Sequence, residues 1–231
     1  MSRVGQDYFP RNISQYVPLM EFAADVIQGQ WFGSLGAPQA LDLNGILVGA
    51  SATTSVQTYT SADWATTFDG SATHLGESAA GSISGKYGRC LTMTGTAGAD
   101  HVVTVTGKDY LGQLMSEAFT LSGTVAQVGV KAFKYVDTVS AAVGASGDTF
   151  DLGWNDKLGV PYSLQVVTRF LEDGVTGSPT TVVANRSTGT ATSTDARGSI
   201  VPATATNGSR EYEVAYSCYT SDLHGLAAYS S

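Results

Sequence analysis

From residue 86 onward, hydrophobic and polar residues alternate along much of the chain with a period of two. The alternating segments are short and separated by glycine-containing stretches: YGRCLTMTG (87–95), HVVTVTG (101–107), QLMSEAFTLSG (113–123), VGVKAFKYVDTVS (128–140), GDTFDLGW (147–154) and YSLQVVTRFL (162–171). A period of two places successive side chains on opposite faces of a strand. Short strands separated by turns at this spacing are typical of an antiparallel β-sandwich or barrel. The pattern therefore predicts a mostly β protein, in which REYEVAYSCYT (210–220) forms the final strand.

Two regions depart from this alternation. Residues 1–45 hold three of the six prolines and a cluster of large apolar side chains, so we expect an aromatic-rich N-terminal arm that packs on its own domain or on a neighbouring molecule. Residues 172–209 have almost no large apolar residues apart from Val and Ile, and here we expect a long polar β-excursion, either a projecting loop or an extended hairpin. Residues 46–231 would then form one β domain, long enough to bury its own core.

The composition agrees with this fold class and narrows the choice of partners. Gly, Ser and Thr make up about a third of the 231 residues and only 14% are charged, which favours short strands and tight turns over long helices. The net charge is −8 and the 12 basic residues are scattered, so no basic stripe is available for nucleic acid phosphates or an anionic membrane. No apolar run approaches the roughly 18 residues of a membrane span, and residues 1–16 lack the apolar core of a signal peptide. We therefore expect synthesis in a cytoplasm, with no nucleic acid and no membrane as partner.

The two cysteines, Cys90 and Cys218, both lie in strand-like segments. Cys218 alternates with Tyr212, Val214 and Tyr216, and such a position favours a buried thiol over a reactive one. A disulfide between the two cysteines stays open, because sequence does not show the geometry that it needs.

One carboxylate stands on an otherwise apolar strand face. Glu117 falls in step with three large apolar residues, Met115, Phe119 and Leu121. The next predicted strand carries Lys131 and Lys134 on opposite faces, so one of them can meet Glu117 whichever face is shared. A cross-strand ion pair contributes about 0.2–1 kcal/mol and helps to fix register. A catalytic carboxylate would need a second titratable group at a defined separation, so we interpret Glu117 with Lys131 or Lys134 as a structural ion pair.

The segment between the two strands, GKDYLG (107–112), predicts a turn, because glycines stand at both of its ends. Lys108 and Asp109 are expected to face water in this turn. Residues 101–123 should therefore form a β-hairpin with Glu117 on its second strand.

Recognisable motifs for catalysis and metal binding are missing from the sequence. There is no HExxH, no CxxC and no GxSxG, and the three histidines are isolated: His74, His101 and His224. We therefore predict no catalytic residues, no resident metal and no cofactor. One alternative is calcium, because Asp148, Asp151, Asn155 and Asp156 stand close together and oxygen ligands at that density could hold the ion. Otherwise Asp148 begins one turn and Asn155–Asp156 make another.

Aromatic side chains offer a second function class. Trp64, Trp154 and the strand tyrosines could stack on sugars if they were exposed, although tyrosines at 212, 216 and 219 more often line a core or an interface. A carbohydrate-binding or adhesive β domain is therefore an alternative interpretation. A wall- or glycan-degrading hydrolase with a paired-acid cleft is a further one.

The order of the strand and turn segments carries a family resemblance. TVTGKDYLGQLMSEAFTL continues into VGVKAFKYVDTVS and GDTFDLGWNDKLGVP, and the chain closes with TSTDARGSIVPATATNGSREYEV and DLHGL. This order resembles structural proteins of tailed-bacteriophage virions, in particular capsid decoration (cement) proteins. The resemblance covers residues 86–226 and rests on turn and strand signatures, which β-rich head fibres and tail components also carry.

The resemblance implies a protein that binds the outer surface of an icosahedral phage capsid in many copies and stabilises it. Its partners would be the major capsid protein and copies of itself, as a trimer or dimer, and it would lie on the capsid surface of the virion. A homo-oligomer that touches several subunits at once gains effective concentration. Because large aromatics supply most hot-spot energy, we expect capsid or oligomer contacts from the N-terminal region: Tyr8, Phe9, Tyr16, Phe22, Trp31 and Phe32.

Overall fold

The computed structural model describes residues 29–65, 87–96, 101–110, 112–142, 147–185 and 192–219. These residues form an almost entirely β, antiparallel fold with one short 3-10 helix, η3 (Ser61–Asp63), which confirms the predicted fold class. The strands are β1 (Gly29–Gly36), β2 (Asp42–Ala52), β3 (Gln57–Tyr59), β4 (Arg89–Gly95), β5 (His101–Lys108), β6 (Leu114–Leu121), β7 (Gln127–Phe133), β8 (Tyr135–Ala141), β9 (Asp148–Gly159), β10 (Leu164–Glu172), β11 (Val175–Thr176), β12 (Thr180–Val182), β13 (Ser199–Val201) and β14 (Tyr212–Cys218).

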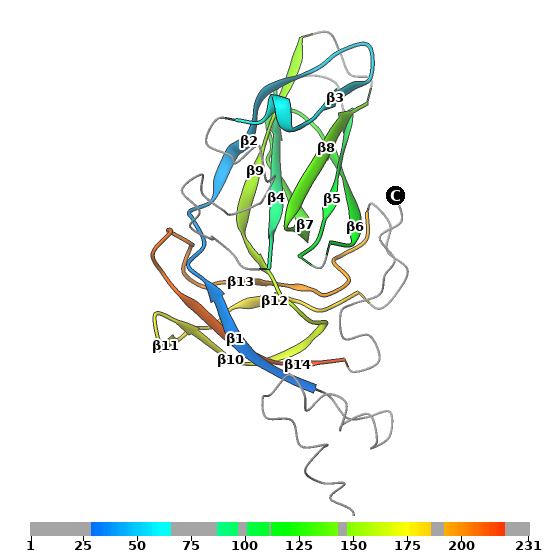
Figure 1. Ribbon diagram of the computed structural model, residues 1–231. Helices are drawn as coiled ribbons and strands as arrows, with labels where there is room; N and C mark the ends of the chain where they lie inside the picture. Colours follow the sequence, from blue (N-terminus) through cyan, green and yellow to red (C-terminus); the bar gives the residue numbers. More distant parts are fainter. Residues whose placement is uncertain are drawn as a thin grey trace, which may run out of the picture.

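Within the described residues, the strands form three antiparallel sheets. The sheet with the order β1-β14-β10-β11 lies at the bottom of Figure 1 and is called the lower sheet below. The second sheet has the order β12-β13-β9-β4-β7, with β2 also paired to β9, and the third has the order β3-β8-β5-β6. Most strands of these two sheets curl around one core in the upper part of the molecule, while β12 and β13 lie between that part and the lower sheet (Figure 1).

Buried apolar side chains gather in two clusters, one in each half of the molecule. The upper cluster includes Leu91, Phe119, Phe133, Phe150, Leu152 and Trp154. The lower cluster includes Leu158, Leu164, Phe170, Ile200, Tyr212 and Tyr216. The long strand β9 contributes to both clusters, since Trp154 lies in the upper one and Leu158 in the lower one. The two halves therefore share one strand.

Strand β9 continues where the sequence suggested a turn. Asn155 and Asp156 lie inside the strand, so the expected turn at these residues is wrong. Their side chains have partners there: Asn155 Nδ2 donates a hydrogen bond to the Leu91 carbonyl at 2.6 Å, and Asp156 meets Arg89. Gly153 in the same strand has no Cβ, and a Cβ there would collide with the Asp42 carbonyl of the paired strand β2. Glycine therefore allows the close approach of the two backbones.

The hairpin predicted over residues 101–123 is confirmed. Strands β5 and β6 pair antiparallel, with Val105 opposite Glu117. The exposure expected for Asp109 is wrong, because its side chain is fully buried and forms an ion pair with Arg197. The turn that holds Asp109 can be buried because Arg197, which is distant in the sequence, supplies the counter-charge.

Within residues 172–209, β12 and β13 form a hairpin that packs into the fold. Strands β12 and β13 pair antiparallel, as the extended-hairpin alternative expected, but β13 also pairs with β9. Asp195, Arg197 and Ser199 are buried. Asp195 accepts a hydrogen bond from the Ala132 N–H, and Arg197 forms an ion pair with Asp109, so both charges have buried partners. A projecting loop is therefore wrong for residues 192–201.

The boundary expected at residue 45 also shifts. Strand β1 pairs with β14 along its length, so residues 29–36 are part of the lower sheet rather than of a separate arm. Residues 1–28 of the expected arm lie outside the described residues.

Candidate functional site

Carboxylates from two other elements close one edge of β7. Glu117 Oε1 on β6 accepts a hydrogen bond from the Val130 N–H at 2.6 Å. Asp195, in the segment before β13, accepts one from the Ala132 N–H at 2.8 Å. Strand β7 pairs with β4 along its other edge, so these two N–H groups are donors that β4 leaves unpaired. We call this side of the strand the β7 edge. Glu117 and Asp195 take the place of a neighbouring strand, since β4 is the only strand of the described residues that pairs with β7.

Burial raises the pKa of Glu117 to about 7, because desolvation outweighs the Val130 hydrogen bond and the positive charge of Lys131. The Glu117 residue is 3% exposed, and its Oε2 has no hydrogen-bond partner among the described residues. This oxygen lies against Gly129, where an added Cβ would come within 2.8 Å of it. The carboxyl group therefore changes charge near neutral pH while it is almost fully buried at the wall of a cavity of about 170 Å³.

Of the two lysines expected beside Glu117, Lys131 is the one that interacts with it electrostatically. The Lys131 ammonium donates a hydrogen bond to the Ser116 carbonyl of β6 at 2.7 Å. Burial lowers the pKa of Lys131, and the Glu117 carboxylate partly offsets this effect. Lys134 follows β7, and its backbone N–H donates to the Lys108 carbonyl at 2.9 Å. Glu117 and Lys131 thus join β6 and β7, two strands that do not pair with each other.

A second buried pair lies at the turn between β5 and β6. Asp109 Oδ2 and Arg197 Nη2 are 3.3 Å apart, and their side chains are 0% and 1% exposed. The Asp109 Oδ1 atom also accepts a hydrogen bond from the Gln113 N–H at 2.9 Å. The Arg197 guanidinium lies over the Tyr110 ring, 4.6 Å from its centroid. These contacts attach the hairpin turn to the segment before β13. Separating the two segments would leave a buried charge without its counter-charge, which is costly.

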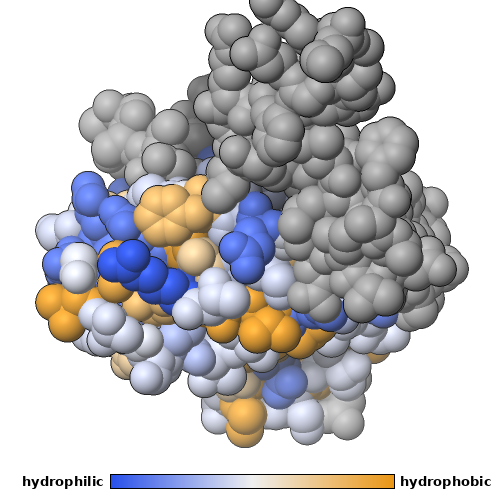
Figure 2. Space-filling view, turned by 90° about the horizontal axis from the view of Figure 1, so that it is seen from below, coloured by the Kyte–Doolittle hydropathy of each residue, from blue (hydrophilic) through white to orange (hydrophobic). Residues whose placement is uncertain are grey.

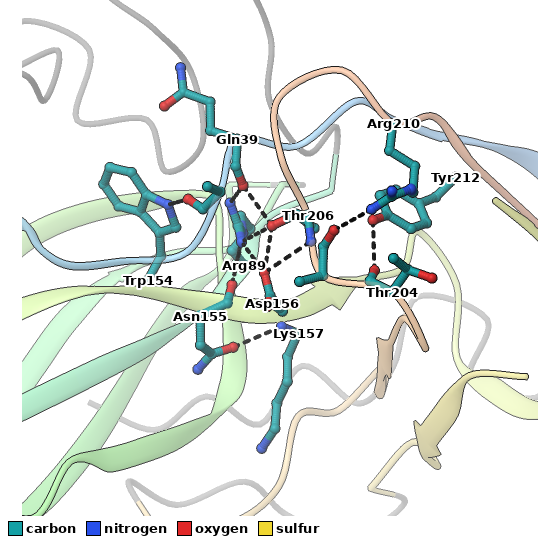
Figure 3. A network of polar contacts seen from close by, with 12 residues as sticks. Gln39, Arg89, Trp154, Asn155, Asp156, Lys157, Thr204, Thr206, Arg210 and Tyr212 are labelled. Atoms are coloured by element: carbon teal, nitrogen blue, oxygen red, sulfur yellow. Dashed lines mark hydrogen bonds and ion pairs between the residues drawn. The ribbon is translucent and has the colours of Figure 1, made fainter. Parts of the chain in front are cut away.

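Arg89 is a third buried polar centre, between the two halves (Figure 3). Its Nη1 donates to the Gln39 carbonyl at 2.6 Å and its Nε to the Asn155 carbonyl at 2.9 Å. Its Nη2 donates to Thr206 Oγ1 at 3.0 Å and lies 3.5 Å from Asp156 Oδ1. Burial lowers the pKa of Arg89 to about 10, although Asp156 opposes the shift. The guanidinium stays charged at neutral pH and connects the loops before β2 and before β14 to β9.

Sequence reasoning did not identify Arg89, Asp195 or Arg197. A signal for the last two was present, because residues 174–209 contain only three charged residues: Arg186, Asp195 and Arg197. An isolated charge in a neutral segment is a candidate for a buried pair when that segment returns to the core. Arg89 lies in an ordinary strand pattern, and its burial depends on loops that are distant in the sequence.

Two of the residues expected to contact the capsid or a second copy, Trp31 and Phe32, are described by the structure and point to opposite sides of β1. Trp31 points into the lower half, with ring centroids 5.7, 6.4 and 5.3 Å from those of Tyr87, Tyr162 and Tyr216. Phe32 points to the opposite side and is 47% exposed. The other expected contact residues lie outside the described residues: Tyr8, Phe9, Tyr16 and Phe22. Phe32 is therefore accessible to a partner, whereas Trp31 stabilises the protein's own core.

The outer face of the lower sheet carries neutral side chains together with two charged ones, Arg169 and Glu213. Two adjacent rows cross β1, β14 and β10, with the residues Phe32, Ala215 and Arg169 in one and Gln30, Ser217 and Val166 in the other. Figure 2 views the molecule from below and shows hydrophobic residues in separate groups among neutral and hydrophilic ones on the part that is not grey. A mixed surface of this kind, with few charges to desolvate, is suited to protein contacts.

The acids proposed for calcium do not converge. Asp148 and Asp156 lie at opposite ends of a strand segment that spans roughly 26 Å at the usual rise per residue. Asp151 accepts a hydrogen bond from the Gly49 N–H at 2.6 Å. Across the described parts of the chain, no group of three or more His, Cys, Asp or Glu residues could hold a metal ion. These acids therefore do not form a single calcium site.

The aromatic residues considered for sugar stacking are mostly inside the protein. Trp64 and Trp154 are 8% and 4% exposed, and Tyr212 and Tyr216 are fully buried. The Trp154 indole N–H donates to the Ala40 carbonyl at 3.0 Å. These four residues form no exposed platform.

Both cysteines are free and buried, which confirms the buried thiol expected for Cys218. Burial raises the pKa of Cys218 to about 12 and that of Cys90 well above its usual range. Both thiols therefore stay protonated and unreactive at neutral pH.

The fold and its polar centres define a class: an antiparallel β protein whose described buried charges brace strand edges and loops. The described residues form no helix that is long and apolar enough to cross a membrane. Comparison with models of known families, with curated proteins and with solved structures gave no match. The resemblance to decoration proteins is therefore carried by the sequence motifs of residues 86–226 alone.

Proposed function

We propose that the chain is a structural virion protein that binds the outer surface of an icosahedral phage capsid in many copies and stabilises it. It acts without catalysis and without a cofactor. Its partners are the major capsid protein and further copies of itself. The observation that carries the proposal is the outer face of the lower sheet, where Phe32 and Val166 are 47% and 56% exposed among mostly neutral side chains.

The buried acids support a structural role. Glu117 and Asp195 accept hydrogen bonds from the β7 edge, Asp109 pairs with Arg197, and Asp156 meets Arg89. Glycoside hydrolysis would need two carboxyl groups about 5–10 Å apart that face the same open cleft. These four acids instead hold elements of the fold together, which agrees with a protein that works through its surface.

A surface with few charged side chains suits many modest contacts. One interface of ~1,600 Å² gives an affinity that depends on a few well-packed aromatic anchors rather than on area. Several copies that bind together add effective concentration to each contact. Among the described residues, Phe32 is the exposed aromatic on this face, and it is the anchor that we propose.

Replacing Phe32 tests this role directly. The Phe32→Lys variant keeps Trp31 in the core and puts a charge where an apolar anchor is proposed, so we expect binding to empty capsid shells to fall at least tenfold. Co-sedimentation of purified protein with shells measures the effect. Val125→Lys is the matched control, because Val125 is 65% exposed in the upper half, and it should bind like the unchanged protein. Equal binding by both variants would contradict the proposal.

The arm is tested by a deletion that spares the lower sheet. Because β1 begins at Gly29, the deletion should remove residues 2–28 and no more. If Tyr8, Phe9, Tyr16 and Phe22 contact the capsid or a second copy, this folded variant binds shells more weakly or sediments as a smaller species. Unchanged binding and unchanged mass would show that these four residues make no such contact.

A further inference from the structure

A slot lies beside the outer edge of β10. Strand β10 pairs with β14 along one edge, and on the other edge it pairs with β11 only at Leu171 and Glu172. The chain then moves away from β10 to form β12, which pairs with β13 in the neighbouring sheet. The space between is a cavity of about 380 Å³, lined by residues 165–170 of β10 and by Thr176, Gly177, Pro179 and Thr181. We call it the β10 slot.

Backbone hydrogen bonds close the β10 slot at both ends. At one end the Leu164 N–H donates to the Arg197 carbonyl at 2.8 Å, and the Leu164 carbonyl accepts from the Ala184 N–H at 2.9 Å. At the other end the Gly177 N–H donates to the Phe170 carbonyl at 3.0 Å. Between these ends, residues 165–169 have no strand partner on this edge within the described chain. About five residues, or roughly 17 Å of strand, therefore present an unpaired edge to the slot.

The side chains of the β10 slot favour a ligand with a negative charge. Arg169 is exposed and makes no hydrogen bond or ion pair among the described residues. The described residues that line the slot include no acid, although the Glu172 side chain lies beside Gly177 at one end and the chain has a net charge of −8. The Gln165 Oε1 atom is buried and has no hydrogen-bond partner among the described residues. Val166 adds an exposed apolar side chain. The lining thus offers a cation, a hydrogen-bond acceptor and an apolar contact beside a free strand edge.

We propose that the β10 slot binds an extended segment of a partner protein, which pairs with residues 165–169 and places an acidic side chain against Arg169. This is recognition by β-strand addition, in which backbone hydrogen bonds supply affinity and side-chain contacts supply specificity. The closed ends exclude the full edge of a second sheet, so one short segment enters from the solvent side. The site goes beyond capsid binding through Phe32, and it shares Val166 and Arg169 with the outer face of the lower sheet.

The two strand edges support this choice of site. At the β7 edge, Glu117 and Asp195 already occupy the free N–H groups, and a guest strand would have to displace buried carboxylates. At the β10 slot no side chain of the described residues takes that place. Because the unpaired edge lies between two closed ends, the edge of another sheet cannot pair with it along its full length, which protects the protein from aggregation. A single short segment can still reach it.

Titration of the full-length protein with the peptide acetyl-Thr-Val-Glu-Val-Thr-amide tests the proposal. We expect NMR shifts of the backbone amides of residues 165–170 and 176–181 and no comparable shifts along β7. Methylation of the peptide nitrogens that face the strand should weaken binding at least tenfold, because it removes backbone donors. Replacing the peptide Glu by Gln should weaken binding about fivefold to tenfold in the unchanged protein. In the Arg169→Gln variant the Glu and Gln peptides should bind equally.

Each alternative result overturns the proposal. No shift at millimolar peptide, or equal binding of the methylated peptide, would exclude strand addition in the slot. A preference for Glu that persists in Arg169→Gln would show that another group reads the charge. Shifts of the same amides that grow with protein concentration alone would show that a second copy fills the slot. Circular dichroism of Arg169→Gln confirms that the variant is folded, because its exposed side chain holds no described contact.

Discussion

The β7 edge and the β10 slot are two solutions to the same problem. In both places a strand lacks a neighbour for part of its length. At the β7 edge, Glu117 and Asp195 bind the free N–H groups and are themselves buried. At the β10 slot the edge stays open and the nearest charge, Arg169, is exposed. Burying a carboxylate is costly unless hydrogen-bond donors compensate it. The β7 edge supplies such donors because β6 and the segment before β13 meet there.

The largest expected effect is at Asp195. The Asp195→Ala variant leaves the buried N–H groups of Ala132 and Arg197 without their acceptor, and we expect the free energy of unfolding to fall by about 3–5 kcal/mol. Urea denaturation measures this loss. Asp195→Asn keeps one acceptor oxygen and should lose clearly less. If the free energy of unfolding of the alanine variant falls by less than about 1 kcal/mol, the Asp195 carboxylate is not needed to stabilise the β7 edge.

A pH-dependent effect is expected at Glu117. Because burial raises its pKa to about 7 from 4.5, the folded protein holds the proton more tightly than the unfolded chain, and stability falls as pH rises between these values. Glu117→Gln does not titrate and keeps an oxygen for the Val130 N–H. We therefore expect its stability relative to the unchanged protein to increase by up to about 3 kcal/mol between pH 4 and pH 8. Denaturant curves at both pH values measure the difference, and a difference that does not vary with pH would contradict the raised pKa.

The smallest effect is expected at the open edge. Arg169→Gln and Val166→Thr change exposed side chains of β10, so the free energy of unfolding should stay within about 0.5 kcal/mol of the unchanged protein. Hydrogen exchange offers a second readout. The amides of Val130 and Ala132 should exchange slowly because carboxylates bind them, whereas unpaired amides in 165–169 should exchange faster. Destabilisation above about 1 kcal/mol would show that the slot already has a structural partner.

Local pattern was sufficient for the β5–β6 hairpin of the upper half. The alternation around Glu117 placed it with Met115 and Phe119 on the buried face, and the glycine-bounded turn located the β5–β6 hairpin. Both are short-range properties, since side chains alternate along a strand and turn residues stand between neighbours. The identity of the lysine beside Glu117 was not accessible, because it depends on which faces of β6 and β7 meet.

Long-range contacts were not accessible from the sequence. Asp109 is buried because Arg197 reaches it, and β1 joins the sheet because β14 lies beside it. Trp31 and Phe32 point to opposite sides because they are neighbours in β1, a strand that the sequence pattern did not predict. These outcomes depend on the packing of distant segments, and local propensity does not determine that packing.

The passage of β9 through both halves has a mechanical consequence. A force applied to the lower sheet reaches the upper half along one continuous backbone, held by β4 and β2 on its two sides. Pulling along that direction loads many inter-strand bonds at once in shear instead of opening them one after another. The two halves should therefore yield together, as a single unit.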